Sequence, residues 1–325
     1  MPDVTKAQTV KTDSAVDAIA PPKADAAPET GAPKSAQSKP RGLWGDAWYD
    51  LRHRPMFWIS ASLLVLLLVI AAFPGMFTSA DPRAGDLTNH YLTKPELGKI
   101  FSPEWFGYDI QGRSIYARVV YGTRASILVG VGVTLAITLF GGLMGLLSGY
   151  FGGWLDSIIS RVTDIFFGIP FLLGAMVVLN AFTERKVFVV ILALAFLGWT
   201  SICRVTRSSV ITAKQADYVT AARALGAGTN RMLFRHVLPN AIAPTIVVAT
   251  ISLGGFISAE ATLSYLGLGL ADPTISWGID IASGSEEIRN NPHVLLFPAG
   301  MLSLTVFAFI MLGDAVRDAL DPKLR

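Results

Sequence analysis

The chain has 325 residues, of which 52% are hydrophobic and only 16% carry a charge. Soluble domains average about 25% charged residues, so this composition predicts an integral membrane protein. The net charge of +3 is too small to indicate nucleic-acid binding, and the one cysteine, Cys203, excludes a disulfide within the chain. The histidines and the cysteine show no metal-binding spacing, so we expect no metal site.

Residues 1–40 are rich in Ala, Pro and Lys and contain no aromatic cluster. Such a segment cannot bury enough apolar surface to order itself, so we predict a disordered cytoplasmic tail. Residues 41–55 then lead into the first apolar run.

Six apolar runs without a charged residue follow, and a helix of about 20 apolar residues is needed to cross a bilayer. The predicted spans are residues 56–77, a helix within 125–155, and then 165–183, 187–203, 241–259 and 294–313. The sequence therefore predicts an all-α membrane protein with six transmembrane helices. The third and fourth spans are separated by only four residues, which indicates a tight helical hairpin.

Six spans place both termini on the same side of the membrane. With both ends in the cytoplasm, the inside segments hold more Lys and Arg than the outside segments, as the positive-inside rule requires. This orientation makes 204–240 and the C-terminal tail 314–325 cytoplasmic, within a core of 125–313. Segments 78–124 and 264–293 are then external.

A row of glycines occupies the second span at Gly141, Gly145, Gly149 and Gly153. A spacing of four residues puts them on one helix face, where two backbones can approach closely. Packing within this chain and contact with a second membrane subunit are both compatible with the row.

The polar stretch 216–240 lies between two apolar runs. Asp217–Leu225 is rich in good helix formers, and Gly226 suits the left-handed residue that ends a helix. Thr229 is placed to cap a second helix over 230–238, and Pro239 stands near the start of the next span. The stretch therefore predicts a helix, a sharp turn and a second helix.

Ala221, Ala222 and Leu225 form a smooth patch on the first of these helices, beside Asp217 and Arg223. Such a short helix suits docking into a groove on another protein. A helix lying on the lipid surface is equally compatible with the spacing.

The stretch resembles the EAA loop of ABC-importer permeases, in which Glu-Ala-Ala is followed at fixed spacing by Gly and by Leu-Pro. The residues that match are Ala221, Ala222, Gly226, Leu238 and Pro239. Thr220 stands where glutamate is usual, and His236 stands where isoleucine is usual.

Further segments are similar to the dipeptide/oligopeptide permease family, specifically its C-type subunit, and the resemblance covers roughly residues 45–325. These segments are FGYDIQGRSIYARVVYGTRASI (106–127), RHVLPN (235–240), LSYLGLG (263–269), SWG (276–278) and LGDAVRDALDPKLR (312–325). The resemblance implies the type I ABC importer permease fold in a bacterial cytoplasmic membrane.

The resemblance also implies partners: a homologous second permease subunit, two ATPase domains that hold ATP and Mg, an external substrate-binding protein and a peptide substrate. This chain has no phosphate-binding loop and no catalytic motif, so we expect it to bind no cofactor itself. The residues expected to couple it to the ATPases are Asp217, Thr220, Ala221, Ala222, Arg223, Leu225, Gly226, Leu238 and Pro239.

Charged residues beside the spans need a physical reason. Glu260, at the outer end of the fifth span, is expected to line the vestibule, to meet a partner helix or to form an ion pair. Asp156, Arg161 and Asp164 precede the third span, and we predict that they form a local salt-bridge cluster.

The external segment 78–124 is long for a connection. Ile115, Val119 and Val120 recur at helical spacing among arginines, which predicts an amphipathic helix on the membrane surface. We expect 78–124 and 264–293 to form a platform for the external binding protein.

Other classes of function fit less well. An ion-driven secondary transporter usually shows inverted repeats and ionisable residues at mid-membrane. A membrane-embedded enzyme needs a nucleophile or metal cluster within its spans. Neither is visible in the sequence. Within the permease family, nickel chelates, glutathione and oligosaccharides stay open as alternative substrates.

Overall fold

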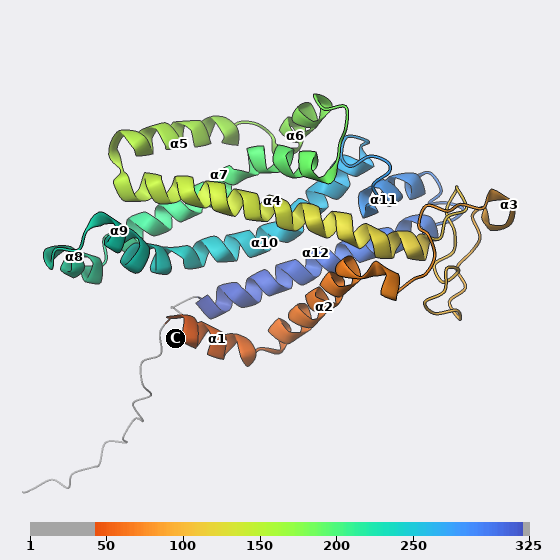
Figure 1. The fold of residues 1–325 in the computed structure, drawn as a ribbon, viewed down its shortest axis with the longest axis horizontal. Helices are drawn as coiled ribbons and strands as arrows, with labels where there is room; N and C mark the ends of the chain where they lie inside the picture. Colours follow the sequence, from red (N-terminus) through yellow and green to blue (C-terminus); the bar gives the residue numbers. More distant parts are fainter. Residues whose placement is uncertain (1–42, 321–325) are drawn as a thin grey trace, which may run out of the picture. The chain divides into compact units, whose positions relative to one another are not determined.

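The structure, a computed structural model, describes residues 43–320 (Figure 1). The predicted tail 1–40 therefore lies outside the described residues. The helices are α1 (Leu43–Arg52), α2 (Pro55–Ala72), η1 (Pro74–Met76), α3 (Leu87–His90), α4 (Ile115–Phe151), α5 (Gly153–Phe167), α6 (Phe171–Asn180), α7 (Val187–Lys214), α8 (Asp217–Ala224), α9 (Thr229–Arg231), η2 (Met232–Val237), α10 (Leu238–Tyr265), α11 (Trp277–Ser285) and α12 (His293–Leu320).

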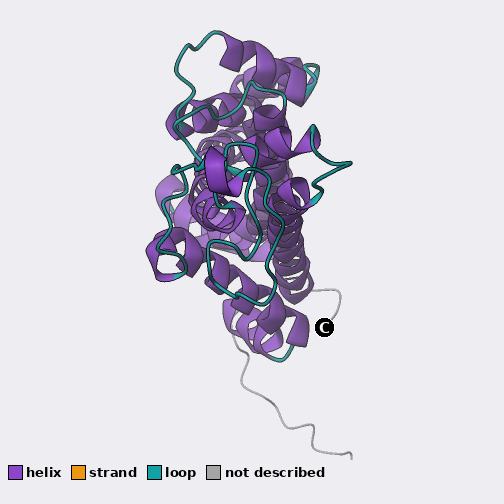
Figure 2. Cartoon of the chain, turned by 90° about the vertical axis from the view of Figure 1, so that its right-hand side faces the viewer, coloured by secondary structure: helices purple, strands orange, loops and turns teal. Residues whose placement is uncertain are grey.

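Within residues 43–320 the chain forms helices and loops and no β-strand, which confirms the predicted all-α class (Figure 2). Five helices in this range are long and apolar enough to cross a membrane, and a bent pair makes a sixth span possible. They are α2, α4, α7, the run from α9 to α10, and α12. Residues 314–320 of the predicted C-terminal tail belong to α12, which continues to Leu320.

The predicted third span is not one straight helix. The predicted residues 165–183 cover only the end of α5 and all of α6, and these two helices meet at an angle of 86°. Gly168 ends α5, and Pro170 precedes the first residue of α6. Proline disfavours helical backbone in the residue before it and cannot donate a helical hydrogen bond, so the break falls at this point. The prediction rested on the length of the apolar run, and the residues on both sides of the break are apolar, so the break was not visible.

Helix α4 begins ten residues before the predicted span and is 37 residues long. The hydroxyl of Ser114 accepts a hydrogen bond from the Ala117 N–H at 3.3 Å, which caps the helix. The predicted amphipathic surface helix is therefore wrong. Ile115 and Val119 are buried, and so is Arg118, which is only 3% exposed. The first turns of α4 are buried against the external segment and α11, through hydrogen bonds such as that from Tyr116 to the carbonyl of Phe77 at 2.9 Å.

Helices α4 and α7 lie side by side and carry the largest apolar core. A Cβ atom at Gly145 would lie 2.4 Å from the carbonyl oxygen of Cys203, and Cβ atoms at Gly141 and Gly149 would lie 2.4 and 2.8 Å from carbonyl oxygens of α7. These glycines therefore serve packing within this chain rather than contact with a second subunit. The core beside them includes Val129, Val133, Leu179, Leu194 and Ile202.

Gly153 does not belong to this row. The backbone turns at Gly152 and Gly153, which have φ angles of +66° and +60° and open space around them. Glycine adopts this left-handed region without steric cost, so the pair ends α4 and starts α5. The glycine repeat in the sequence therefore extends to Gly153, although α4 ends at Phe151.

The carboxylates of α5 pair with α7 and not with Arg161. Asp156 accepts two hydrogen bonds from Arg207, at 2.5 and 2.7 Å. Asp164 accepts one from Arg204 at 2.8 Å. The predicted local cluster is thus replaced by two ion pairs that join α5 to its neighbour, because charged side chains between packed helices meet across the interface.

Candidate functional site

The predicted coupling segment forms a separate short helix at one end of α7. Helix α7 continues past the predicted span to Lys214, and α8 follows after two residues. Gly226 has a φ angle of +81° and donates its N–H to the carbonyl of Arg223 at 3.0 Å. The predicted helix with a left-handed glycine stop is therefore present. Figure 1 places α8 at the opposite end of α4 from the external segment.

One side of α8 is anchored in a small apolar cluster, which we call the loop core. Val219 is fully buried in it, and Ala222 packs against its edge. The loop core brings together side chains from α4, α7, η2 and α10, and its members are Leu146, Val210, Ala213, Val219, Met232, Leu233, Val237 and Ala241. A displacement of α8 would therefore act on all of these helices at once.

The other side of α8 is exposed. Leu225 is 88% exposed, and Asp217, Thr220, Ala221 and Arg223 are exposed with it. The predicted smooth patch is only partly correct, because Ala222 faces the loop core. Leu225 directly follows the last residue of α8, so the leucine and the exposed polar residues form one surface that is free to contact another protein.

Polar contacts hold the N-terminal end of α8 and the end of α7 that precedes it. Lys214 donates a hydrogen bond to the carbonyl of Tyr150 at 2.5 Å, which joins the end of α7 to α4. The Tyr218 hydroxyl donates to the carbonyl of His236 at 3.4 Å. Partial burial raises the pKa of Tyr218 above its ordinary value, which is already well above neutral pH.

The second helix of the segment differs from the prediction. Gly228 and not Thr229 occupies the capping position, and no side chain accepts a capping hydrogen bond there. The helix then runs without a break through α9, the π-helical η2 and α10, with Pro239 near the start of α10. Proline cannot donate to the preceding turn, and a wider π turn accommodates this loss.

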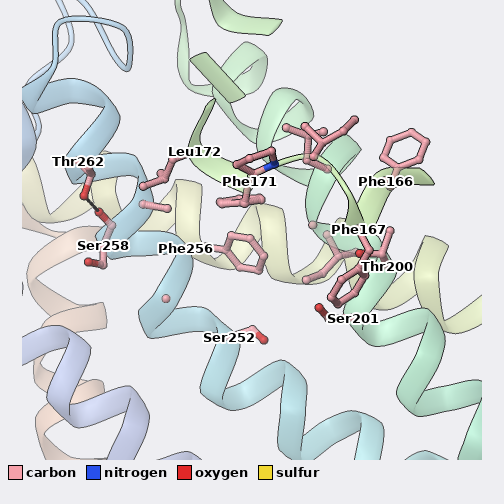
Figure 3. A pocket seen from close by; sticks show the side chains of 17 residues that line it. Phe166, Phe167, Phe171, Leu172, Thr200, Ser201, Ser252, Phe256, Ser258 and Thr262 are labelled. Atoms are coloured by element: carbon pink, nitrogen blue, oxygen red, sulfur yellow. Dashed lines mark hydrogen bonds between the residues drawn. The ribbon is translucent and has the colours of Figure 1, made fainter. Parts of the chain in front are cut away.

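A cavity of about 640 Å³ opens near the bend between α5 and α6 (Figure 3). It is lined by α4, α5, α6, α7 and α10, and none of its lining residues is charged. Its aromatic residues are Phe166, Phe167, Phe171 and Phe256, and its hydroxyl residues are Thr200, Ser201, Ser252, Ser258 and Thr262. Phe171 and Phe256 meet edge to face across it, with ring centroids 5.9 Å apart. The sequence reasoning missed this site because its residues come from five separate helices.

Glu260 is fully buried, so within this chain it neither lines a vestibule nor offers a surface to a partner helix. It accepts hydrogen bonds from the hydroxyls of Ser264 at 2.7 Å and Ser126 at 3.3 Å. The structure gives it no cationic partner among the described residues. Glu260 instead joins α10 to α4 through serine hydroxyls.

A buried ion-pair cluster ties the external segment to the helices. Arg118 on α4 donates to Asp280 on α11, and also to the carbonyl of Pro82 at 3.3 Å. Asp109 binds Arg113 at 2.8 Å and lies 4.0 Å from Arg118. The sequence predicted a membrane-surface helix among the arginines of this segment and did not reveal this cluster.

The predicted coupling residues from 217 to 226 therefore gather on α8 and its turn, whereas Leu238 and Pro239 stand at the start of α10. Glu260 lies at the other end of α10. Among the described residues no group of His, Cys, Asp and Glu could hold a metal ion.

Comparison with known proteins identifies the family. Residues 141–325 match the sequence profile of the binding-protein-dependent transport system inner membrane component family. Residues 42–95 match the N-terminal transmembrane domain of oligopeptide transport permease C.

Relatives match over nearly the whole chain. The oligopeptide transport system permease protein OppC of Bacillus subtilis is 37% identical, over 92% of this chain and 96% of the relative. The dipeptide transport system permease protein DppC of Alkalihalophilus pseudofirmus is 34% identical, over 87% and 90%. The glutathione transport system permease protein GsiD of Pectobacterium atrosepticum is 36% identical, over 88% and 93%. The chain therefore belongs to the binding-protein-dependent inner-membrane permeases, as a C-type subunit of the dipeptide/oligopeptide ABC importer group with the type I permease fold.

Proposed function

We propose that this permease subunit imports di- or oligopeptides by alternating access, driven by ATPase domains that dock on α8. The observation that supports coupling most directly is the two-sided α8. One side is held in the loop core, and the other exposes Leu225 and its polar neighbours. A helix of this kind can pass a push from a docked protein into α7 and α10 together.

The uncharged cavity supports a role as one wall of the transport path. Its volume of about 640 Å³ falls within the usual range for small-ligand sites. Hydroxyl groups offer hydrogen bonds to a peptide backbone, and phenyl rings contact side chains of many shapes. Because no fixed charge lines the wall, peptides of either charge can pass. A homologous second permease subunit would supply the opposite wall, and an external binding protein would deliver the peptide.

Relatives named for oligopeptides, dipeptides and glutathione all match this chain at similar identity. Di- and oligopeptides are the preferred substrate class because two of these three names and the profile over residues 42–95 refer to them or their permeases. Uptake of labelled peptide in competition with glutathione tests this choice. Stronger competition by glutathione than by unlabelled peptide would overturn it.

Site-directed cross-linking tests the coupling. Cys203 is the single cysteine, so Cys203→Ala gives a cysteine-free chain in which Leu225→Cys adds one reactive site on α8. We expect this variant, in native membranes, to cross-link to an ATP-binding protein. The matched control is Val177→Cys on α6, which is 73% exposed and far from α8 in the chain.

ATP and a non-hydrolysed analogue are then compared, and we expect the yield at Leu225→Cys to change between them. An ATPase cross-linked equally from both positions, or from neither, would contradict docking on α8. Peptide uptake by the same cysteine variants shows whether the importer is still assembled.

A further inference from the structure

A second concave site lies on the external side, away from α8 and from the uncharged cavity. It has a volume of about 320 Å³ and includes Arg83, Tyr121 and Arg124. A neighbouring hollow of about 410 Å³ shares Arg83 and Tyr121. We call the two together the arginine groove.

The arginine groove carries a net positive charge. Arg124 is exposed and forms no ion pair among the described residues, and Arg83 uses one nitrogen to donate to the carbonyl of Pro273 at 3.0 Å. The one carboxylate in the groove is that of Asp81, which accepts from the Arg83 backbone N–H at 2.9 Å. Two guanidinium groups facing one hollow are suited to bind a single anion by charge-assisted hydrogen bonds.

The apolar part of the groove identifies the kind of anion. Ala125, Leu128 and Val187 line the same hollow as the arginines. Leu128 is also the first residue of an exposed row along α4, whose members are Leu128, Val131, Leu135, Leu139, Phe140 and Leu143. A ligand in the groove would therefore contact arginine at one end and an uninterrupted apolar stripe at the other.

The length of this row matches a membrane. At about 1.5 Å per residue, the row from Arg124 to Leu143 covers roughly 28 Å. The hydrocarbon core of a bilayer is about 30 Å thick. When the row faces lipid, Arg124 stands at the level of the outer headgroups, where Tyr121 is also favoured as an interfacial aromatic residue.

We propose that the arginine groove binds the phosphate of a phospholipid in the outer leaflet, with the acyl chains of that lipid on the apolar row of α4. Arg83 and Arg124 hold the phosphate, and Leu128 begins the contact with the chains. Because Arg83 lies in the loop before α4 and Arg124 on α4 itself, the bound lipid also links that loop to the membrane core.

Native mass spectrometry of the full chain in detergent, titrated with dioleoyl phosphatidylglycerol, tests this site. We expect the double variant Arg83→Gln/Arg124→Gln to bind the lipid about ten-fold or more weakly than the wild type. The double variant to lysine keeps the charge and is expected to bind at an intermediate level. The matched control is Arg289→Gln, since Arg289 is also an exposed arginine of the external side and lies outside the groove.

Three results would overturn the proposal. The first is equal lipid binding by the wild type and the glutamine variant. The second is displacement of the lipid by inorganic phosphate at equal concentration, which would show a site for a free anion. The third is equal binding of dioleoylglycerol, which lacks the phosphate. If the arginine variants still bind the lipid but no longer accept substrate from the external binding protein, the groove instead binds a carboxylate of that protein. Thermal melting of every variant shows whether it is folded.

Discussion

Gly145 and Gly142 stand three residues apart on α4 and face different surroundings. A Cβ at Gly145 would lie 2.4 Å from the Cys203 carbonyl oxygen, whereas a Cβ at Gly142 meets nothing within 4 Å. We expect Gly145→Ala to lower the free energy of unfolding by about 1 to 3 kcal/mol, because the two backbones must separate. Gly142→Ala is the control and should change it little. Thermal unfolding in detergent measures both, and equal melting temperatures would contradict the close helix contact.

Glu260 is a buried carboxyl group that we expect to stabilise the fold. Its serine partners are Ser126 and Ser264, and the Ser264 hydroxyl also accepts from the Leu270 N–H at 3.0 Å. We expect Glu260→Ala to destabilise the protein by about 2 kcal/mol or more, since it leaves a cavity and unpaired hydroxyls. Glu260→Gln retains an acceptor and should cost less. The melting temperatures of the two variants in detergent measure this difference. A lower melting temperature for Glu260→Gln than for Glu260→Ala would contradict the structural role.

For single residues, the sequence indicated what a side chain can do better than it indicated which residues surround that side chain. The glycine spacing indicated close helix approach at Gly141, Gly145 and Gly149, because small size alone determines that role. It could not show that Gly153 lies beyond the helix end. Nor could it show that Glu260 is enclosed, since its serine partner Ser126 is 134 positions away in the chain.

Among the elements, the external segment, α4 and α11 depend on the pair Arg118–Asp280. Both side chains are at least nine-tenths buried. We expect Asp280→Ala to cost about 3 to 5 kcal/mol, because it leaves the Arg118 charge buried without its partner. Arg118→Met/Asp280→Leu removes both charges and should recover much of this loss. A double-mutant cycle followed by thermal unfolding measures the coupling. Additive losses would show that the two residues do not interact.

Element boundaries were predictable where the chain carries its own signal. Gly226 marks the end of α8, because glycine adopts a positive φ easily. Ser114 caps α4 at its start, whereas the apolar run alone placed that start ten residues later. The bend at Gly168–Pro170 was missed because the flanking runs on both sides are apolar. The ion pairs Asp156–Arg207 and Asp164–Arg204 were missed because helix spacing describes one helix and not its neighbour.

For the whole molecule, the orientation in the membrane stays a prediction. The cysteine-free Cys203→Ala chain carries Leu225→Cys on α8 or Leu97→Cys in the external segment, and both positions are well exposed. A membrane-impermeant maleimide added to intact cells should label only Leu97→Cys, and should label both after the cells are opened. Labelling of Leu225→Cys in intact cells would invert the proposed topology.

The whole-chain class followed from composition, since few charges and long apolar runs are required of any chain that spans lipid. The uncharged cavity and the arginine groove did not follow from it. The cavity is assembled from five helices, and the groove combines α4 with loop residues that are distant in sequence.

The contact of α4 with α7 restricts which parts of the protein can move. Because Gly141, Gly145 and Gly149 place backbone against backbone, a slide of one helix turn that moves Ile137 to the place of Gly141 would push its side chain against the α7 backbone, where the glycine leaves no room for it. The two helices should therefore travel as one rigid body. Any widening of the uncharged cavity within this chain then falls to the side formed by α6 and α10, where Phe171 and Phe256 meet edge to face.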